Sequence, residues 1–175
     1  MPDLEIRTAR IEDADELSYI DKIVWGKTMA ASTDQLRLRT ETYESGQAVC
    51  VVGDSIYGFM NSQKISSDNS LLGYKSETER AKWAEATDDG KIENSHNPDG
   101  NILFLINLSV WAAIEEDTGA YRGIAGKGLV DYMKRLTIEE RLDRMEGITR
   151  LNGFDRYIRR HRTDYNTLTS SDQLE

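Results

Sequence analysis

The residues with the clearest chemical potential form a glycine-rich segment, Gly123-Ile124-Ala125-Gly126-Lys127-Gly128. It follows a strongly apolar stretch and precedes residues with helical apolar spacing. Glycines let backbone N–H groups approach a ligand, and the first turn of a helix leaves N–H donors unpaired at its positive end. The sequence therefore predicts a turn here that holds an anion, most often phosphate or pyrophosphate, or else an ordinary turn that only packs the helix.

Two nucleotide-binding patterns do not fit this segment. A dinucleotide-binding fingerprint places such glycines after the first strand of a repeated βαβ array, whereas here they follow a hairpin and a long polar loop. A P-loop requires Ser or Thr directly after Gly-Lys, but Gly128 and Leu129 follow Lys127. The segment therefore matches neither a dinucleotide-binding fingerprint nor a P-loop.

Nucleophilic and metal chemistry have few candidate residues in this chain. The single cysteine, Cys50, lies in the apolar run Ala-Val-Cys-Val-Val, which favours a buried thiol in a reducing compartment and hence a cytoplasmic location. The two histidines, His96 and His161, lack metal-ligand spacing with each other or with Cys50, so no metal site is expected.

Length, charge and hydropathy limit the classes of function. The 175 residues suit one domain, and no apolar run is long enough for a membrane span. The first residues show no basic or apolar region typical of a secretory signal. A net charge of −9 argues against a general nucleic-acid binder. Residues 156–162 nevertheless hold four arginines and His161, which indicate either a solvated terminal helix or a local site for phosphate or an acidic partner protein.

The first half of the chain predicts one strand, two helices and a hairpin. A strand is expected at residues 4–9, and apolar residues at helical spacing follow it. These residues are Leu17, Ile20, Ile23 and Val24. Ser32-Thr33-Asp34 predicts the cap of a second helix at 36–43, which Gly46 ends. Strands at 48–52 and 55–65 form an antiparallel hairpin, in which Gly58 suggests a bulge or a close backbone approach.

The second half predicts a polar insertion followed by a crossover unit. Residues 66–100 are expected to be a long polar loop apart from a helix at 76–86, and such loops are more often functional than idle. Residues 101–110 predict a central buried strand, the glycine-rich turn and a helix follow, and a strand is expected at 144–149. A last helix is expected at 154–160. This order predicts a three-layer α/β domain.

The whole pattern resembles a GCN5-related N-acetyltransferase (GNAT) domain over almost all of the chain. The resembling segments are LEIRTARIEDADEL, QAVCVVGDSIYGFM, LFLINLSV, YRGIAGKGLVDYM and ITRLNGF. A subset of the family also carries the equivalents of residues 35–39 (QLRLR), Trp83 with Thr87 and Gly90, and residues 96–100 (HNPDG). The resemblance implies one GNAT-like domain at 1–175, with a mixed, mostly antiparallel sheet splayed between its fourth and fifth strands.

The family resemblance also implies acyl transfer from acetyl-CoA or another acyl-CoA to an amine, with the thioester arm in the splay. By carry-over, Leu108 and Val110 offer backbone groups to the pantetheine. The pyrophosphate would be held by the loop formed of Arg122, Gly123, Ala125, Gly126, Lys127, Gly128 and Leu129. Gly123 stands where the family has Arg or Gln, so the loop bulges or Arg122 takes that role. The long link at 111–121 is a flap over the thioester, a site for a longer acyl chain, or a surface insertion.

No residue stands out as the base that takes the proton of the amine, because the fourth strand lacks the buried glutamate that is frequent in the family. His96 is the first candidate base, since a neutral imidazole suits work near pH 7, although it could instead order its loop. Tyr157 is the candidate acid or a packing residue. Asn107 could orient the amine or a water, or be a satisfied strand residue. Trp83 could line the acceptor pocket or attach the insertion to the core.

The expected function is therefore an N-acyltransferase for a primary amine of a small molecule or a peptide side chain. One alternative is transfer of a long acyl chain from acyl-CoA or an acyl-carrier protein, with residues 156–162 docking the acidic carrier. Another is a non-catalytic acyl-CoA-binding module, since fold alone does not decide function.

Overall fold

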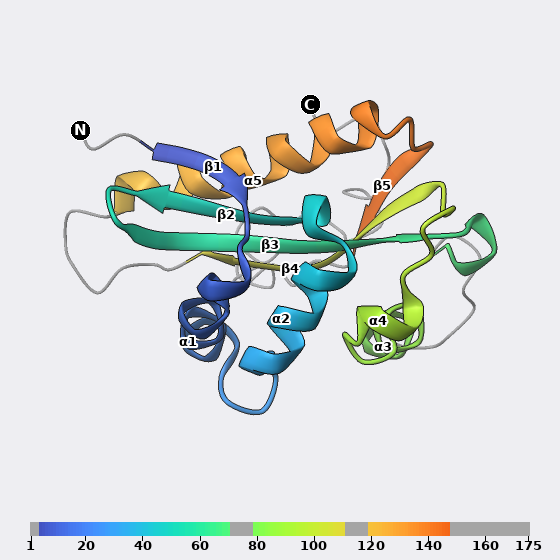
Figure 1. Ribbon diagram of the computed structural model, residues 1–175, viewed down its shortest axis with the longest axis horizontal. Helices are drawn as coiled ribbons and strands as arrows, with labels where there is room; N and C mark the ends of the chain where they lie inside the picture. The colour runs from blue at the N-terminus through green and yellow to red at the C-terminus, as the bar shows by residue number, and fades with distance from the viewer. Residues whose placement is uncertain (1–3, 71–78, 111–118, 148–175) are drawn as a thin grey trace, which may run out of the picture.

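A five-stranded mixed sheet forms the centre of the fold. The computed structural model describes residues 4–70, 79–110 and 119–147, with backbone alone at 79–82 and 119–122. The strands are β1 (Leu4–Thr8), β2 (Gln47–Val52), β3 (Ser55–Ile65), β4 (Ile102–Val110) and β5 (Arg144–Gly147). They lie in chain order; β1 to β4 are antiparallel, and β5 runs parallel to β4 (Figure 1).

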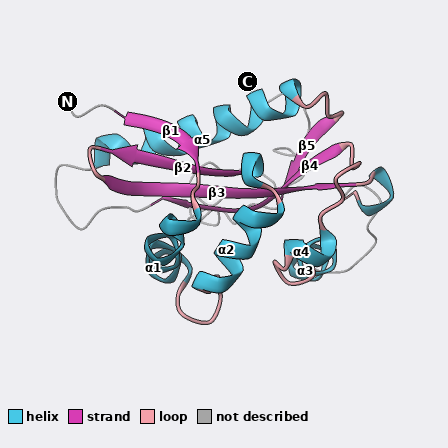
Figure 2. Ribbon diagram, viewed as in Figure 1, coloured by secondary structure: helices cyan, strands magenta, loops and turns pink. Residues whose placement is uncertain are grey.

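Helices cover both faces of this sheet and make three layers (Figure 2). The helices are α1 (Ala14–Trp25), α2 (Thr33–Thr42), α3 (Glu79–Thr87), α4 (Ile92–Ser95) and α5 (Gly119–Glu139). Of the helices in the described ranges, α5 lies over one face, while α1 to α4 lie on the other. The expected α/β class, with a mostly antiparallel sheet and a β4-α5-β5 crossover, is confirmed.

The two N-terminal helices follow their sequence signals with two corrections. Leu17 and Ile20 are buried as expected, but Ile23 is 44% exposed, so the apolar face of α1 is narrower than its spacing suggested. Ser32 caps α2 by accepting a hydrogen bond from the Gln35 backbone, and the Gln35 side chain accepts one from Ser32 in return. This helix ends at Thr42, before Gly46, which instead closes a short 3₁₀ turn.

The β2–β3 hairpin has the expected bulge beside Gly58. The pairing shifts between Cys50 and Val51, and Gly58 pairs with Cys50. A Cβ atom at Gly58 would lie 2.8 Å from the backbone oxygen of Ser109, which no side chain tolerates. Gly58 therefore allows β3 and β4 to lie together at this point, and both expectations for it are confirmed.

A second irregularity lies in β4. Asn61 of β3 pairs with Asn107, but the next residue of β3, Ser62, pairs with Leu105. Ile106 is therefore an extra residue, and β4 carries a β-bulge there. β5 pairs only with the first half of β4, Ile102 to Leu105. The residues from Ile106 to Val110 continue without a partner on that side among the described strands, as the expected splay requires.

The polar insertion is more ordered than the sequence suggested. Beyond α3, a short helix, α4, stands where an irregular loop was expected. Ile92 of α4 is fully buried, and this apolar contact explains why the segment is fixed. Positive φ angles at Asp88, Asp89 and Gly90 turn the chain between the two helices.

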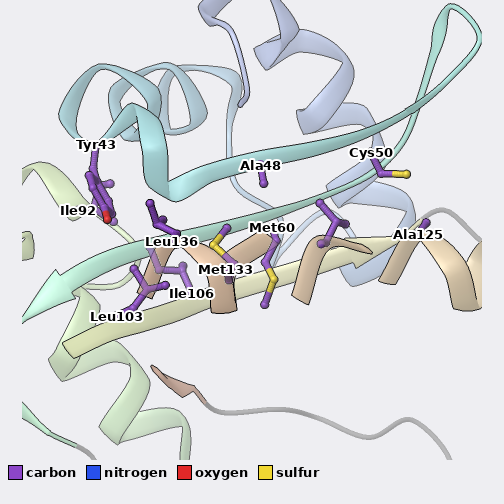
Figure 3. Packing of buried hydrophobic residues seen from close by; sticks show 11 residues of the cluster. Tyr43, Ala48, Cys50, Met60, Ile92, Leu103, Ile106, Ala125, Met133 and Leu136 are labelled. Atoms are coloured by element: carbon purple, nitrogen blue, oxygen red, sulfur yellow. The ribbon is translucent and has the colours of Figure 1, made fainter. Parts of the chain in front are cut away.

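The main core lies between α5 and the sheet. Ala125, Leu129 and Met133 of α5 are fully buried and belong to one cluster with Met60 and Leu103 (Figure 3). A separate cluster packs α1 and α2 against the other face. In the part of the chain that the structure describes, no helix is both long and apolar enough to cross a bilayer.

Candidate functional site

The second half of β4 is the part of the sheet that a ligand could pair with. From Ile106 to Val110 its backbone continues past β5, and we call the β5-side edge of these residues the open edge. In a strand, N–H and C=O groups of alternate residues point to one edge, and among the described residues no strand pairs with this edge beyond Leu105. Leu108 and Val110, the residues expected to contact a pantetheine chain, lie within it.

The glycine-rich segment lies inside α5, not in a turn before it. The helix is already formed at Gly119, so the segment from Gly123 to Gly128 forms its second and third turns. In an α-helix each N–H bonds to the carbonyl four residues earlier, so the N–H groups from Gly123 onward are engaged. The expectation of a turn at 123–128 was wrong, because Ala125 and Leu129 are buried in the core and keep this stretch helical.

The helix nevertheless brings part of the expected donor site together. A Cβ atom built at Gly126 would lie 3.9 Å from the Val110 side chain, so this glycine borders the end of the open edge. Lys127 is exposed, and its ammonium group pairs with Asp131 on the helix surface. The side chain of Arg122 lies outside the described residues.

Trp83 stabilises the bulge in β4. Its indole Nε1 donates a hydrogen bond to the Ile106 carbonyl oxygen at 2.9 Å. The bulged residue thus gives its carbonyl to a side chain from the insertion. Trp83 also packs against the core, so the alternative in which it attaches the insertion is confirmed by its contacts. Its expected role in an acceptor pocket stays a prediction.

A buried carboxylate lies behind the open edge. Asp21 of α1 is only 2% exposed, and both of its oxygens accept hydrogen bonds. Oδ1 accepts from Asn107 Nδ2 at 3.1 Å and from the Ser109 hydroxyl at 2.6 Å. Oδ2 accepts from the backbone N–H of Ala31 at 2.7 Å, and the Trp25 indole donates to Ser109 Oγ at 2.8 Å. These contacts connect α1 to the two polar side chains of β4.

A buried arginine lies on the same face of the sheet. Arg39 of α2 donates to the Gly90 carbonyl at 3.1 Å and to Asn61 Oδ1 at 3.0 Å. Burial lowers the pKa of Arg39 to about 10, while the negative charges of Asp21 and Glu93 limit that decrease. The guanidinium therefore stays charged near neutral pH. Since Asn61 pairs with Asn107 across the strands, two amide residues stand between the buried cation and the buried anion.

His96 lies elsewhere in the fold. Its Nδ1 accepts a hydrogen bond from the Lys64 backbone N–H at 3.1 Å, and its ring stacks on Tyr43 with centroids 4.7 Å apart. Lys64 pairs with Leu103, about 13 Å along β4 from Asn107. Burial and then the Lys64 charge lower the pKa of His96, so the imidazole is neutral near pH 7. These contacts favour the loop-ordering alternative over the base.

Several expected features fall outside the described residues. These are Tyr157, the arginine-rich residues 156–162, the helix at 154–160, the start of the helix expected at 76–86, and residues 111–118 of the link. Among the residues the structure does describe, no group of three His, Cys, Asp or Glu side chains is arranged to hold a metal ion. Cys50 is buried, and burial raises the pKa of its thiol to about 11, so it is a poor nucleophile.

Sequence reasoning missed Asp21 and Arg39, although each had a signal. Asp21 lies four residues after Leu17, on the apolar face of α1, and an acid at such a position needs a buried partner. Arg39 ends the QLRLR segment that resembles a family subset, but its burial depends on the insertion that covers it. Only the fold shows that Asp21 and Arg39 lie on the same face behind β4.

The comparison with protein families and sequences gives one relative. No family model matches the chain. The chain is 30% identical over 127 residues to "Uncharacterized N-acetyltransferase YkwB" of Bacillus subtilis (strain 168). The match covers 72% of this chain and 50% of the relative, so the chain spans about half the length of that protein.

Solved structures with this fold are more numerous. The loading GNATL domain of CurA from Lyngbya majuscula has a TM-score of 0.65 at 17% identity, covering 89% of this chain and 69% of that one. The GphF GNAT-like decarboxylase in complex with isobutyryl-CoA has a TM-score of 0.62 at 21% identity, covering 93% and 73%. Ard1 from Thermoplasma volcanium has a TM-score of 0.54 at 16% identity, covering 91% and 79%.

The sheet with its half-paired fourth strand and crossover helix thus defines a GNAT fold. The Bacillus relative is named as an N-acetyltransferase, and the fold of this chain is that of the GCN5-related N-acetyltransferases.

Proposed function

We propose that the chain transfers an acyl group from an acyl-CoA to a primary amine of a small molecule or a peptide side chain. The observation that carries the proposal is the open edge, where β4 continues past β5. An extended thioester arm with amide groups could pair with this edge as a further strand would. The GNAT fold and the similarity to a protein named as an N-acetyltransferase support the same activity.

The donor fits the residues around the open edge. Leu108 and Val110 would offer backbone groups to the pantetheine arm. Gly126 borders Val110 and has no side chain to fill the space beside it. Any free N–H groups at the start of α5 belong to Arg122 or earlier residues, because later ones are engaged in the helix. We therefore place the pyrophosphate one to two turns earlier than the sequence suggested, at the start of α5.

The reaction forms one bond and breaks one. The amine nitrogen bonds to the thioester carbonyl carbon, the carbon–sulfur bond breaks, the amine passes a proton to solvent water, and the thiolate takes one from its acid. A backbone N–H of the open edge would polarise the carbonyl. β4 carries no acidic side chain, and its two polar ones, Asn107 and Ser109, both donate to Asp21. Ser109 is fully buried, so Asn107 is the residue of β4 expected to orient the amine, and Tyr157 remains the expected acid for the thiolate.

Donor binding and transfer are tested together with one variant. Acetyl-CoA at 100 times its Kd should stabilise the protein by about 2.7 kcal/mol, which raises Tm by several degrees. Gly126→Glu places a charged side chain beside Val110, in the space proposed for the pantetheine arm, so the rise in Tm should disappear. Release of CoA thiol with a panel of amino acids, polyamines and lysine peptides then measures transfer. An unchanged Tm rise in the variant would contradict the donor site.

The two alternatives give different results in the same assay. A rise in Tm with a long-chain acyl-CoA but not with acetyl-CoA would favour fatty acyl transfer. A rise with acetyl-CoA but no thiol release with any amine would favour a binding module. Transfer that requires an acyl-carrier protein as donor would favour the alternative in which residues 156–162 dock this acidic carrier.

A further inference from the structure

The Asn107 side chain has one satisfied end and one unsatisfied end. Its Nδ2 donates to Asp21, while its Oδ1 is buried and accepts no hydrogen bond. A buried acceptor without a partner is unfavourable, and native proteins retain few of them. Asn107 directly follows the bulged residue Ile106, in the half of β4 that carries the open edge. The unsatisfied oxygen therefore lies where the proposed reaction takes place.

Asp21 determines which end of the amide is unsatisfied. An ionised carboxylate only accepts hydrogen bonds, so Asn107 must present its NH₂ group to Asp21 and its oxygen to the other side. Asp21 itself cannot turn away. Its oxygens are held by Ser109 on one side and by the Ala31 backbone on the other, and the group is almost fully buried.

We propose that Asp21 is a positioning residue that fixes the Asn107 amide so that Oδ1 accepts an N–H of the attacking amine. This inference rests on the proposed function and adds the recognition of the acceptor to it. A neutral primary amine has two N–H groups and one lone pair. When Oδ1 accepts one N–H, the lone pair is free to point at the carbonyl carbon of a thioester on the open edge. Asp21 does not touch the substrate.

Asp21→Asn should reverse the orientation of Asn107. The new side chain would keep its oxygen on the Ala31 N–H, so its NH₂ group would face Asn107. Asn107 must then turn its oxygen toward residue 21 and its NH₂ group toward the amine. The N–H groups of Asn107 and of the amine would face each other, and no hydrogen bond could form between them. We expect kcat/KM for the acceptor to fall at least about tenfold, the equivalent of one lost hydrogen bond, while KM for acetyl-CoA stays unchanged.

A double exchange supplies the rescue. In Asp21→Asn/Asn107→Asp, the amide at 21 donates to the carboxylate at 107 and to Ser109 Oγ, and still accepts from Ala31. The carboxylate again presents an acceptor oxygen to the amine. Most of the lost kcat/KM should return. A structural rescue alone would appear as a higher Tm than that of Asp21→Asn, so the recovery supports positioning where kcat/KM for the acceptor returns without a matching gain in Tm.

Two further variants separate positioning from stability. Trp25→Phe removes the indole hydrogen bond to Ser109 and leaves Asp21 and Asn107 unchanged. We expect it to lower Tm but not to raise the acceptor KM. Asn107→Leu keeps the size of a half-buried side chain and should cause the same acceptor defect as Asp21→Asn, even if the latter folds poorly.

The rates of all variants are measured with acetyl-CoA and the best amine of the panel. Acceptor kcat/KM within twofold of wild type in Asp21→Asn, or in Asn107→Leu, overturns the inference while the proposed function stands. An equal acceptor defect in Trp25→Phe also overturns it. Wild-type protein that binds acetyl-CoA but acylates no amine overturns both the inference and the proposed function.

Discussion

Among the individual residues, His96 has the most complete set of contacts outside the β4 network. Its Nδ1 accepts a hydrogen bond from the Lys64 backbone N–H, its ring stacks on Tyr43, and the residue follows directly after α4. Tyr43 in turn donates from its hydroxyl to Glu140, which also pairs with Lys64. His96 therefore joins the insertion to the end of β3, and a neutral ring is required for Nδ1 to accept.

This role predicts a pH dependence of stability. Burial and Lys64 lower the pKa of His96 below 6.5, so between that value and the folded-state pKa the unfolded chain binds more protons. The free energy of unfolding should therefore fall as pH falls below 6.5. His96→Asn keeps an acceptor for Lys64 but does not titrate, so it should lose less stability between pH 7.5 and 5.5. Denaturant unfolding at both pH values measures the difference.

The same variant decides the role of His96 in catalysis. If His96 only orders its loop, His96→Asn leaves kcat and its pH profile unchanged. A large loss of kcat, together with the loss of an acidic limb from the profile, would contradict the structural role and restore His96 as the base.

Single residues were predictable only where their chemistry is local. Asn107 could be proposed from its place in an apolar strand, and the structure gives its amide a partner on one side. Asp21 could not be paired with it, because 86 residues separate the two and their contact depends on how α1 packs on β4. Trp83 and Ile106 present the same difficulty, since a backbone carbonyl has no sequence signature.

Helix α5 is unusual among the elements in holding three glycines within six residues. Gly128 has a packing reason, since a Cβ atom there would lie 3.0 Å from the Ile6 side chain of β1. Gly123 has none, since a Cβ atom would meet nothing within 4 Å. Glycine in a helix interior costs up to about 1 kcal/mol relative to alanine.

Gly123→Ala should therefore stabilise the protein. We expect the free energy of unfolding to increase by about 0.5–1 kcal/mol, seen as a Tm higher by roughly 1–4 °C. Gly128→Ala is the matched control and should gain less, because its Cβ presses on Ile6. A lower Tm for Gly123→Ala would show that the helix around residue 123 is not formed in solution.

Elements were predictable where the local pattern and the tertiary packing agree. The hairpin, β4 and the cap of α2 all follow their sequence signals. The segment 123–128 did not, since glycine favours a turn locally while the buried residues Ala125 and Leu129 favour a continuous helix. α4 was missed because four residues carry too little periodicity to indicate a helix.

For the molecule as a whole, the partly paired sheet is the defining property. Within the described parts of the chain, β4 has a partner on each side at Ile102 to Leu105 and pairs with β3 alone beyond that point. All helices of the described residues except α5 lie on the Asp21 face, so the two faces behind the open edge differ, one apolar and one polar. The order of strands and helices was sufficient to predict this architecture.

Hydrogen exchange tests this arrangement directly. Amides at 106–110 that face the open edge should exchange faster than those at 102–105, because none of the described strands pairs with them there. Acetyl-CoA should slow exchange at 106–110 and leave 102–105 unchanged. Equal protection of both halves in the free protein would contradict the splay.

The extra residue in β4 has a consequence for how the strand is encoded. Before it, Leu103 and Leu105 point toward α5; after it, Leu108 and Val110 do. The two-residue alternation therefore changes from odd to even numbers at Ile106, and Asn107 and Ser109 reach Asp21 only because of this change of phase. A strand of strict alternation would have turned both polar residues into the core under α5. One inserted residue thus separates a strand that merely completes a sheet from one that presents polar groups on its opposite face.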